Sequence, residues 1–252
     1  VAFHEHGVAR AAAGWLRARG VAVECDAYGN LLARVAGGRG TPLVLVAHMD
    51  HPGVHLVSRT RARLAGGVAP SALAEPVPVR VRGLDWERRG RLVDFDAATR
   101  TFRYEGEPLG RGPAFAVWDL PDLVREPDRW TLRAADDLVG CTAILWLLGQ
   151  AAQTRARRPV IGVLTRAEEV GLLGATLLAQ ARRLPADALV VSLEASRELP
   201  GGQIGQGPVV RVGDRTSTFS PAAEALLTAA AARLAERAPA FRYQRQLMSG
   251  GT

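Results

Sequence analysis

Cysteine is scarce in this sequence, and long apolar runs are missing. The 252 residues hold two cysteines, Cys25 and Cys141, which excludes a disulfide framework and fits a reducing compartment. No stretch approaches the roughly 18 uninterrupted apolar residues that a membrane-spanning helix needs. The segment Val1–His6 lacks a starting Met and the basic-then-apolar pattern of a signal peptide. We therefore expect a cytoplasmic protein without a membrane partner.

Lysine is absent altogether. All 32 strongly basic residues are arginines, and the formal net charge is +7. A nucleic-acid binder can have such a charge. Here, however, the arginines are scattered among alanines and glycines, and no basic run is interleaved with aromatic residues. The preference for arginine and alanine is more simply a coding bias, so we expect no nucleic-acid partner.

The sequence does contain enough apolar residues for a large core. Hydrophobic residues make up 48% of the chain, whose length suits one large domain or two smaller ones. Helical spacing predicts helices after Asp137 and over residues 5–19, 172–183 and 221–237. Short apolar runs predict strands over residues 21–25, 31–35, 42–47, 159–164, 188–193 and 208–212. This alternation predicts an α/β fold with a mostly parallel sheet flanked by helices.

The pattern changes between residues 56 and 128. Short alternating segments such as Val77–Arg82 and Thr101–Tyr104 are separated by turn residues, and no helical period is evident. This pattern predicts a small inserted all-β domain over residues 56–128. The flanking segments, 1–55 and 129–252, then form one discontinuous catalytic domain.

The most informative feature is the acidic pair Glu168–Glu169, which follows the apolar run 159–164. The run predicts a buried strand, and ligands of open α/β sheets bind at the carboxyl ends of such strands. Two adjacent like charges are costly there unless a positive charge lies beside them. A metal ion would supply it, with one carboxylate as ligand and the other acting on water. The alternative is the solvated first turn of a helix, where acids are favoured.

A histidine ends the predicted strand at 42–47. A neutral imidazole is a good zinc ligand, which makes His48 a candidate. Asp50 follows two residues later and could hold the ring in one tautomer. The alternative for His48 is a structural role at the strand end.

Two aspartates open the predicted helix near residue 137. A single Asp suffices as a helix N-cap, so the pair Asp136–Asp137 leaves one carboxylate to bridge two cations. Glu194 follows the predicted strand at 188–193, and its alternative is a surface acid. Together with the histidine and the paired glutamates, these residues would lie at one edge of the sheet. They are the parts of a two-metal hydrolase, which needs a bridging carboxylate, terminal ligands and a base near a water.

Three segments carry a resemblance to a known family. Val46–Asp50, Ala135–Cys141 and Glu168–Ala175 resemble the motifs of the dinuclear metallo-aminopeptidases of the glutamyl aminopeptidase and tetrahedral aminopeptidase type. The order and spacing of the motifs fit, as does a β domain inserted between the first two. The resemblance covers most of the chain.

The resemblance implies two divalent metal ions, zinc or alternatively cobalt or manganese. Asp136 would bridge the ions. The remaining protein ligands would be His48 and Glu194 on one ion and Glu169 on the other. Glu168 would be the general base, and Asp50 would orient the histidine.

The sequence departs from the family pattern at three places. Leu138 stands where an Arg is common, and Glu194 stands where an Asp is common. The family also has a final His ligand after a Ser-Gly-Gly-Thr loop, and Ser249–Thr252 are the last residues here. One protein ligand of the second ion is therefore missing from this sequence.

The predicted function is that of a metal-dependent aminopeptidase, which removes N-terminal residues of peptides with a water activated by two metal ions. One alternative is a related amidohydrolase or carboxypeptidase, because the same metal core can attack any amide. Another is a non-catalytic metal-binding relative. Glu168 argues against the latter, since a structural metal site needs no base. We expect peptide substrates and a homo-oligomer.

Overall fold

The computed structural model describes residues 1–154, 156–196, 198, 202–214 and 217–248. The chain divides into two units, Val1–Ala195 and Ser196–Thr252. The Ser249–Thr252 segment, which matches the family's loop, lies outside the described residues. None of the helices in the described ranges has the length and apolar character to cross a bilayer.

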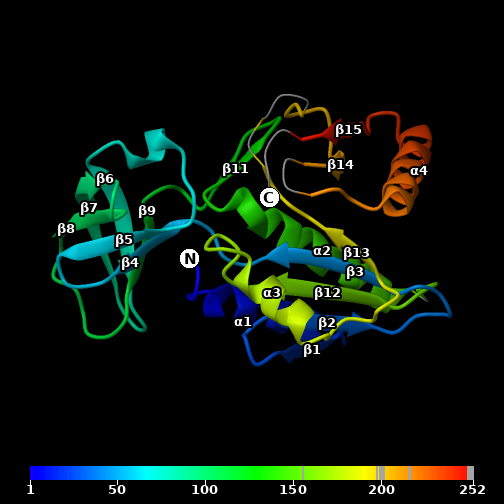
Figure 1. The fold of residues 1–252 in the computed structure, drawn as a ribbon, viewed down its shortest axis with the longest axis horizontal. Helices are drawn as coiled ribbons and strands as arrows, with labels where there is room; N and C mark the ends of the chain where they lie inside the picture. Colours follow the sequence, from blue (N-terminus) through cyan, green and yellow to red (C-terminus); the bar gives the residue numbers. More distant parts are fainter. Residues whose placement is uncertain (155, 197, 199–201, 215–216, 249–252) are drawn as a thin grey trace. The chain divides into compact units, whose positions relative to one another are not determined.

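Five strands form one sheet in the first unit (Figure 1). Their spatial order is β1 (Ala22–Cys25), β2 (Leu31–Val35), β12 (Val160–Thr165), β3 (Leu43–His48) and β13 (Leu189–Ser192). β3 pairs in parallel with both β12 and β13. β2 pairs antiparallel with both β1 and β12. The sheet is therefore mixed, and the expectation of a mostly parallel sheet is not confirmed.

A tight turn explains the antiparallel edge of this sheet. Asp26 Oδ1 accepts the backbone N–H groups of Tyr28 and Asn30, each at 2.9 Å, and so closes the turn that joins β1 to β2. A connection this short joins antiparallel neighbours, whereas parallel strands need a crossover of about a dozen residues or more. The sequence indicates the turn, but not that β2 also borders β12.

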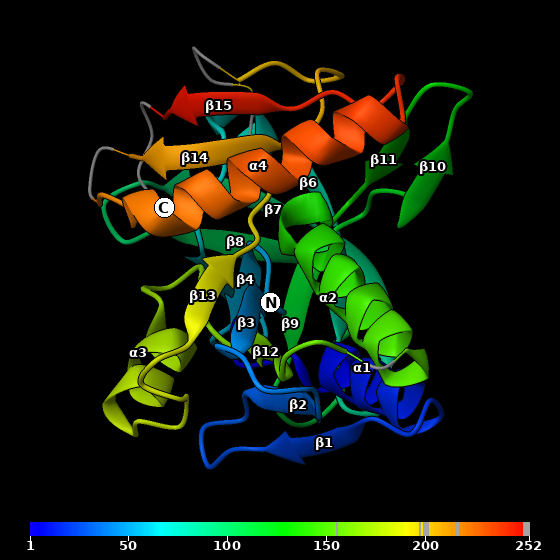
Figure 2. The same ribbon diagram turned by 90° about the vertical axis from the view of Figure 1, so that its right-hand side faces the viewer.

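Helices cover both faces of the sheet (Figure 2). α1 (His6–Arg17) and α2 (Ala135–Gln153) lie on one face, and α3 (Leu173–Gln180) lies on the other. Successive residues of β3 point to opposite faces. Leu45 accordingly packs with α1 and α2, and Val44 packs with α3. All six residues of β12 are buried, as expected for a strand covered on both sides.

Six antiparallel strands form a closed barrel in the same unit. They pair in the order β4 (Gly53–Leu56), β5 (Arg61–Ala65), β8 (Thr101–Gly106), β7 (Glu87–Asp96), β6 (Val77–Arg82) and β9 (Phe115–Trp118). The barrel has its own core, which includes Val54, Leu92 and Phe102. A short 3₁₀ helix covers Pro70–Leu73. β10 (Leu123–Arg125) and β11 (Trp130–Leu132) form a separate hairpin after the barrel.

The second unit is a strand–helix–strand motif. β14 (Val209–Gly213) and β15 (Gln244–Leu247) pair in parallel, and α4 (Pro221–Arg237) connects them. α4 begins at Pro221 because a proline suits the first helical turn and the Ser220 hydroxyl accepts the Ala223 N–H at 3.4 Å. The helix has the bounds that its sequence pattern predicts.

Candidate active site

The carboxyl ends of the parallel strands bring the predicted site residues together. His48 ends β3 and lies in register with Thr165, the last residue of β12. The loop after β12 carries Glu168–Glu169, and Glu194 follows β13. Asp136 lies at the start of α2. This is the edge of an α/β sheet where ligands bind.

One ring nitrogen of His48 faces three carboxylates. His48 Nε2 lies 3.0 Å from Asp136 Oδ1, 3.5 Å from Glu194 Oε1 and 3.8 Å from Glu168 Oε2. It is buried and has no hydrogen-bond partner of good geometry among the described residues. Although burial disfavours protonation, the carboxylates of Asp136, Asp50 and Glu194 raise the pKa of His48. A buried ring nitrogen that faces several acids without a hydrogen bond fits a nitrogen ligand of a metal cation.

The other ring nitrogen is held by Asp50. His48 Nδ1 lies 3.0 Å from the backbone oxygen of Asp50 and 3.6 Å from a carboxylate oxygen of the same residue. A hydrogen on Nδ1 leaves Nε2 free to bind a metal. The Asp50 carboxylate has a second task, because it accepts the backbone N–H groups of Glu168 at 3.0 Å and Glu169 at 3.2 Å. Asp50 thus fixes both the histidine and the acidic pair.

The two aspartates at the start of α2 differ in what they contact. Asp137 is fully buried, and its oxygens accept the backbone N–H groups of Gly140 at 3.1 Å and His48 at 3.3 Å. The side chain of Asp136 is half exposed, and its Oδ1 faces the histidine. Ligand atoms of His48, Asp137 and Glu194 also lie within 4.8 Å of one another, so spacing alone admits either aspartate. The two aspartates differ in that both oxygens of Asp137 already accept backbone N–H groups.

Burial and nearby carboxylates raise the pKa values of three acids at this site, Asp137, Glu168 and Glu169. Burial, then Asp136 and Glu168, raise the pKa of Glu169 to about 7. Burial and the Glu194 carboxylate raise the pKa of Asp137 to about 7. Burial also raises the pKa of Glu168 above its usual range. Like charges gathered in this way require a compensating cation to stay ionised together.

Two further contacts frame the site. Glu169 lies against Gly66, which follows β5, has a φ of +86° and would place a Cβ 3.0 Å from Glu169 Oε2. The Cys141 thiol donates to the His48 backbone oxygen at 3.1 Å, and burial raises the pKa of this thiol to about 12. Cys141 is therefore a neutral packing group and not a metal ligand. No local pattern in the sequence indicates either contact, because each joins residues that are far apart along the chain.

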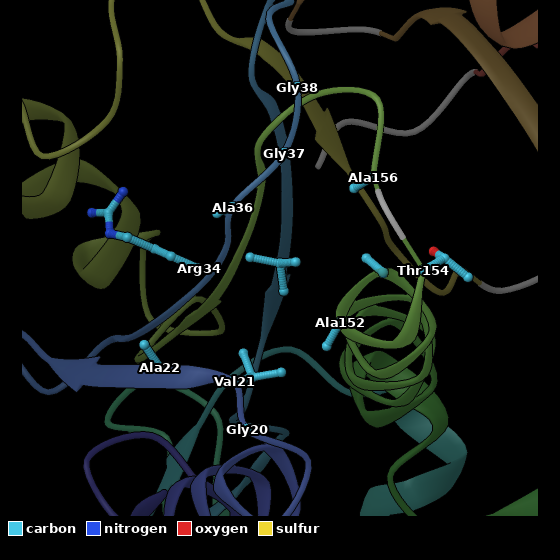
Figure 3. A pocket seen from close by; sticks show the side chains of 12 residues that line it. Gly20, Val21, Ala22, Arg34, Ala36, Gly37, Gly38, Ala152, Thr154 and Ala156 are labelled. Carbon is cyan, nitrogen blue, oxygen red and sulfur yellow. The ribbon is translucent and has the colours of Figure 1, made fainter.

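A hollow of about 470 Å³ lies at the opposite end of the sheet (Figure 3). Val35 of β2 lines the hollow and pairs with Val160, the first residue of β12. The candidate site lies beyond Thr165, the last residue of β12. The described residues that line the hollow are small or apolar apart from Arg34 and Thr154. They include no carboxylate, histidine or cysteine, so this hollow offers none of the chemistry of the candidate site.

The motifs and their geometry agree with the comparison to known proteins. Residues 108–252 match the sequence profile of the M42 glutamyl aminopeptidase family. The chain belongs to this family. As a member of the M42 glutamyl aminopeptidase family it is a metal-dependent aminopeptidase, which confirms the predicted enzyme class.

Individual relatives agree with this assignment. A protein named "Putative aminopeptidase" from Acetivibrio thermocellus is 25% identical over 237 residues, which cover 84% of this chain and 69% of the relative. An aminopeptidase from the archaeon Desulfurococcus kamchatkensis has a similar structure, with a TM-score of 0.81 and 23% identity over all of this chain and 77% of the other. The Pyrococcus horikoshii TET1 peptidase has a TM-score of 0.77 and 20% identity, covering all of this chain and 82% of the other. At these identities the two structures establish a shared fold.

Proposed function

We propose that this chain removes the N-terminal residues of peptides by hydrolysis with a water activated between two divalent ions. The observation that carries the proposal is the buried Nε2 of His48, which faces the carboxylates of Asp136, Glu194 and Glu168 and has no hydrogen-bond partner among the described residues. A purely structural metal site would not need the extra carboxylate. A hydrolytic site does, because the attacking water must lose a proton.

Each ion has proposed protein ligands. His48, Asp136 and Glu194 would hold one ion, and Asp136 and Glu169 would hold the second. Imidazole nitrogen and carboxylate oxygen suit zinc, and cobalt or manganese would also accept this set. When bound, such ions lower the pKa of water and polarise the carbonyl group of the scissile amide.

Glu168 is the proposed general base. Its Oε2 lies 3.8 Å from His48 Nε2, farther than the two carboxylates assigned as ligands of the same ion. In the proposed reaction this oxygen takes a proton from the attacking water and passes it to the amine that leaves. Asp50 keeps the base in place by accepting the backbone N–H of Glu168.

The domain division and the assembly belong to the same proposal. We assign residues 1–55 and 129–252 to the catalytic domain and residues 56–128 to an inserted β domain that shapes access or subunit contacts. The Pyrococcus horikoshii TET1 peptidase assembles into a tetrahedron or a large octahedral shell. By analogy we propose that this chain forms a homo-oligomer and acts in the cytoplasm.

The test measures the rate of cleavage of an aminoacyl-p-nitroanilide and of the same compound acetylated on its amine. The metal content of the protein is measured alongside. An aminopeptidase cleaves the free amine and not the acetylated compound. Cleavage of both would indicate a broader amidohydrolase. Release of the C-terminal residue from an acetylated peptide would indicate a carboxypeptidase. A protein that binds metal and cleaves none of these would be a non-catalytic relative.

A further inference from the structure

The loop between β12 and α3 carries the proposed base and must be held in one position. Two of its residues, Ala167 and Leu172, have φ values of 51° and 56°. Residues other than glycine rarely adopt this left-handed region, and such a backbone persists only where its surroundings fix it. Asp50 supplies some of that fixation from within the site. Two buried side chains outside the ligand set supply more.

Glu5 is the first of these side chains. It occupies the N-cap position of α1, yet its carboxylate makes no capping bond to that helix. Instead its Oε1 accepts the Ala167 N–H at 3.1 Å and the Phe3 N–H at 2.8 Å, and its Oε2 accepts Arg166 Nε at 3.0 Å. Glu5 is 2% exposed. A carboxylate buried this deeply must have partners, and two of its three are in the loop just before Glu168.

Asn30 is the second. It is fully buried at the end of the turn between β1 and β2. Its Oδ1 accepts the backbone N–H of Arg166 at 3.1 Å, and its Nδ2 donates to the backbone oxygen of Gly174 at 3.0 Å and to Asp26 Oδ2 at 2.8 Å. One side chain therefore ties both ends of the loop together. The approach is so close that a Cβ on Gly174 would lie 2.4 Å from Asn30 Oδ1.

We propose that Glu5 and Asn30 are positioning residues that set where Glu168 lies. Neither residue belongs to the proposed ligand set, and each acts through the loop. The inference rests on the proposed function, in which Glu168 moves the proton. Proton transfer requires the base within about 3 Å of its partner, and a misplacement of about 1 Å can lower a rate by about 10²-fold.

The first experiment replaces Glu5 by Gln in the full chain and measures turnover of the aminoacyl-p-nitroanilide. The variant keeps the size of the side chain but removes its charge and turns an amide N–H₂ towards Arg166 Nε. We expect kcat to fall about 10- to 100-fold with KM nearly unchanged. The matched control is Glu24→Gln, because Glu24 is exposed and pairs with Arg34 and Arg183. The kcat of this control is expected to stay within about twofold of the parent, as for most surface ion pairs.

A double-mutant cycle separates positioning from a general loss of folded protein. In a Glu168→Gln background the base is already gone, so adding Glu5→Gln is expected to change kcat by less than about twofold. A purely structural role would lower kcat by the same factor in both backgrounds, and that result would overturn the inference. Circular dichroism at the assay temperature verifies that each variant is folded.

Asn30→Asp is the second variant, and it tests the positioning role if Glu5→Gln does not fold. It keeps Oδ1 as an acceptor for the backbone N–H of Arg166 but removes the amide donor to both Gly174 and Asp26. The same pattern is expected: a lower kcat in the parent background and little change in the Glu168→Gln background. Parent-like kcat in a folded Glu5→Gln or Asn30→Asp variant, with Glu168→Gln inactive, would contradict the positioning role. Full activity of Glu168→Gln alone would instead contradict the proposed function.

Discussion

At the scale of residues, His48 and Asp136 each have a neighbouring aspartate that makes hydrogen bonds of its own. His48 keeps Nε2 available because Asp50 engages Nδ1. Asp137 beside Asp136 accepts the backbone N–H groups of Gly140 in α2 and of His48 at the end of β3. The site is therefore organised by the hydrogen bonds of the residues beside the ligands as much as by the ligands themselves.

The clearest residue-scale prediction concerns the base. Glu168→Gln removes the proton acceptor and leaves the proposed ligands in place. Because general bases typically contribute about 10²–10⁴-fold, we expect kcat to fall by that factor while the metal content is retained. Elemental analysis alongside the anilide assay checks this. Loss of bound metal in step with activity would show that Glu168 is a ligand instead.

The paired aspartates allow a second test at this scale. Asp136→Asn is expected to lower the metal content with little change in the melting temperature of the metal-free protein. Asp137→Asn turns an amide N–H₂ towards the His48 backbone N–H, and an unpaired buried donor costs about 1–3 kcal/mol of stability. We therefore expect this variant to melt at a lower temperature even in EDTA. The reverse pattern would assign the ligand to Asp137.

At the scale of elements, α2 and β12 approach each other closely at Gly162. A Cβ on Gly162 would lie 2.6 Å from both Ile144 Cγ2 and Leu148 Cδ1. These side chains belong to the core that joins the helix to the sheet. The glycine therefore sets how near the helix that carries the aspartates can come to the strand that leads to Glu168.

Gly162→Ala is expected to destabilise the fold by about 1–3 kcal/mol, because an extra methyl group overpacks this contact. The control is Gly14→Ala in α1, where nothing lies within 4 Å of the new Cβ. In a helix interior that change is expected to stabilise by about 0.5–1 kcal/mol. Urea denaturation measures both variants. An unchanged free energy of unfolding in Gly162→Ala would mean that α2 can move away from the sheet without loss of stability.

At the scale of the whole molecule, stability is linked to the acids of the site. In the metal-free protein Glu169 and Asp137 have pKa values of about 7, above their ordinary 4.5 and 3.8. For these two acids the folded state binds more protons than the unfolded state, so their contribution to stability falls as the pH rises from about 4 to about 7. The raised pKa of His48 acts in the same direction, because the stability that it contributes is lost as the pH rises. Burial lowers the pKa values of His4 and His51 to about 4, and these two groups act in the opposite direction between about pH 4 and 6.5.

We therefore expect the melting temperature of the parent in EDTA, relative to that of Glu169→Gln, to be lower at about pH 8 than at about pH 5.5, because the comparison cancels the contribution of the histidines. Added zinc is expected to recover the loss at the higher pH, because bound cations offset the repulsion between the carboxylates. Thermal melts followed by circular dichroism measure both effects. In Glu169→Gln the contribution of this carboxylate to the fall in melting temperature in EDTA is expected to be lost. A difference in melting temperature between the parent and Glu169→Gln that stays constant across this pH range without metal would contradict the charge balance described for the site.

Local patterns in the sequence predicted much of the fold. The apolar runs at 42–47 and 159–164 correspond to β3 and β12, and α4 has the bounds of its helical pattern. The turn at Asp26–Asn30 was predicted from its residue types. These features are local, because periodicity shows which faces of a segment are buried and turn residues show where a segment ends. The family was also identified from its motifs, since they combine short spacing with unusual chemistry.

Tertiary structure decided what depends on distant partners. Periodicity does not specify which strands become neighbours, so the pairing of β2 with β12 and the mixed sheet came only from packing. The sequence left open which aspartate caps the helix, because both offer the same carboxylate. Asn30 and Glu5 contact a loop 136 and 162 residues away along the chain. No local pattern records such contacts, since they exist only once the sheet has brought the segments together.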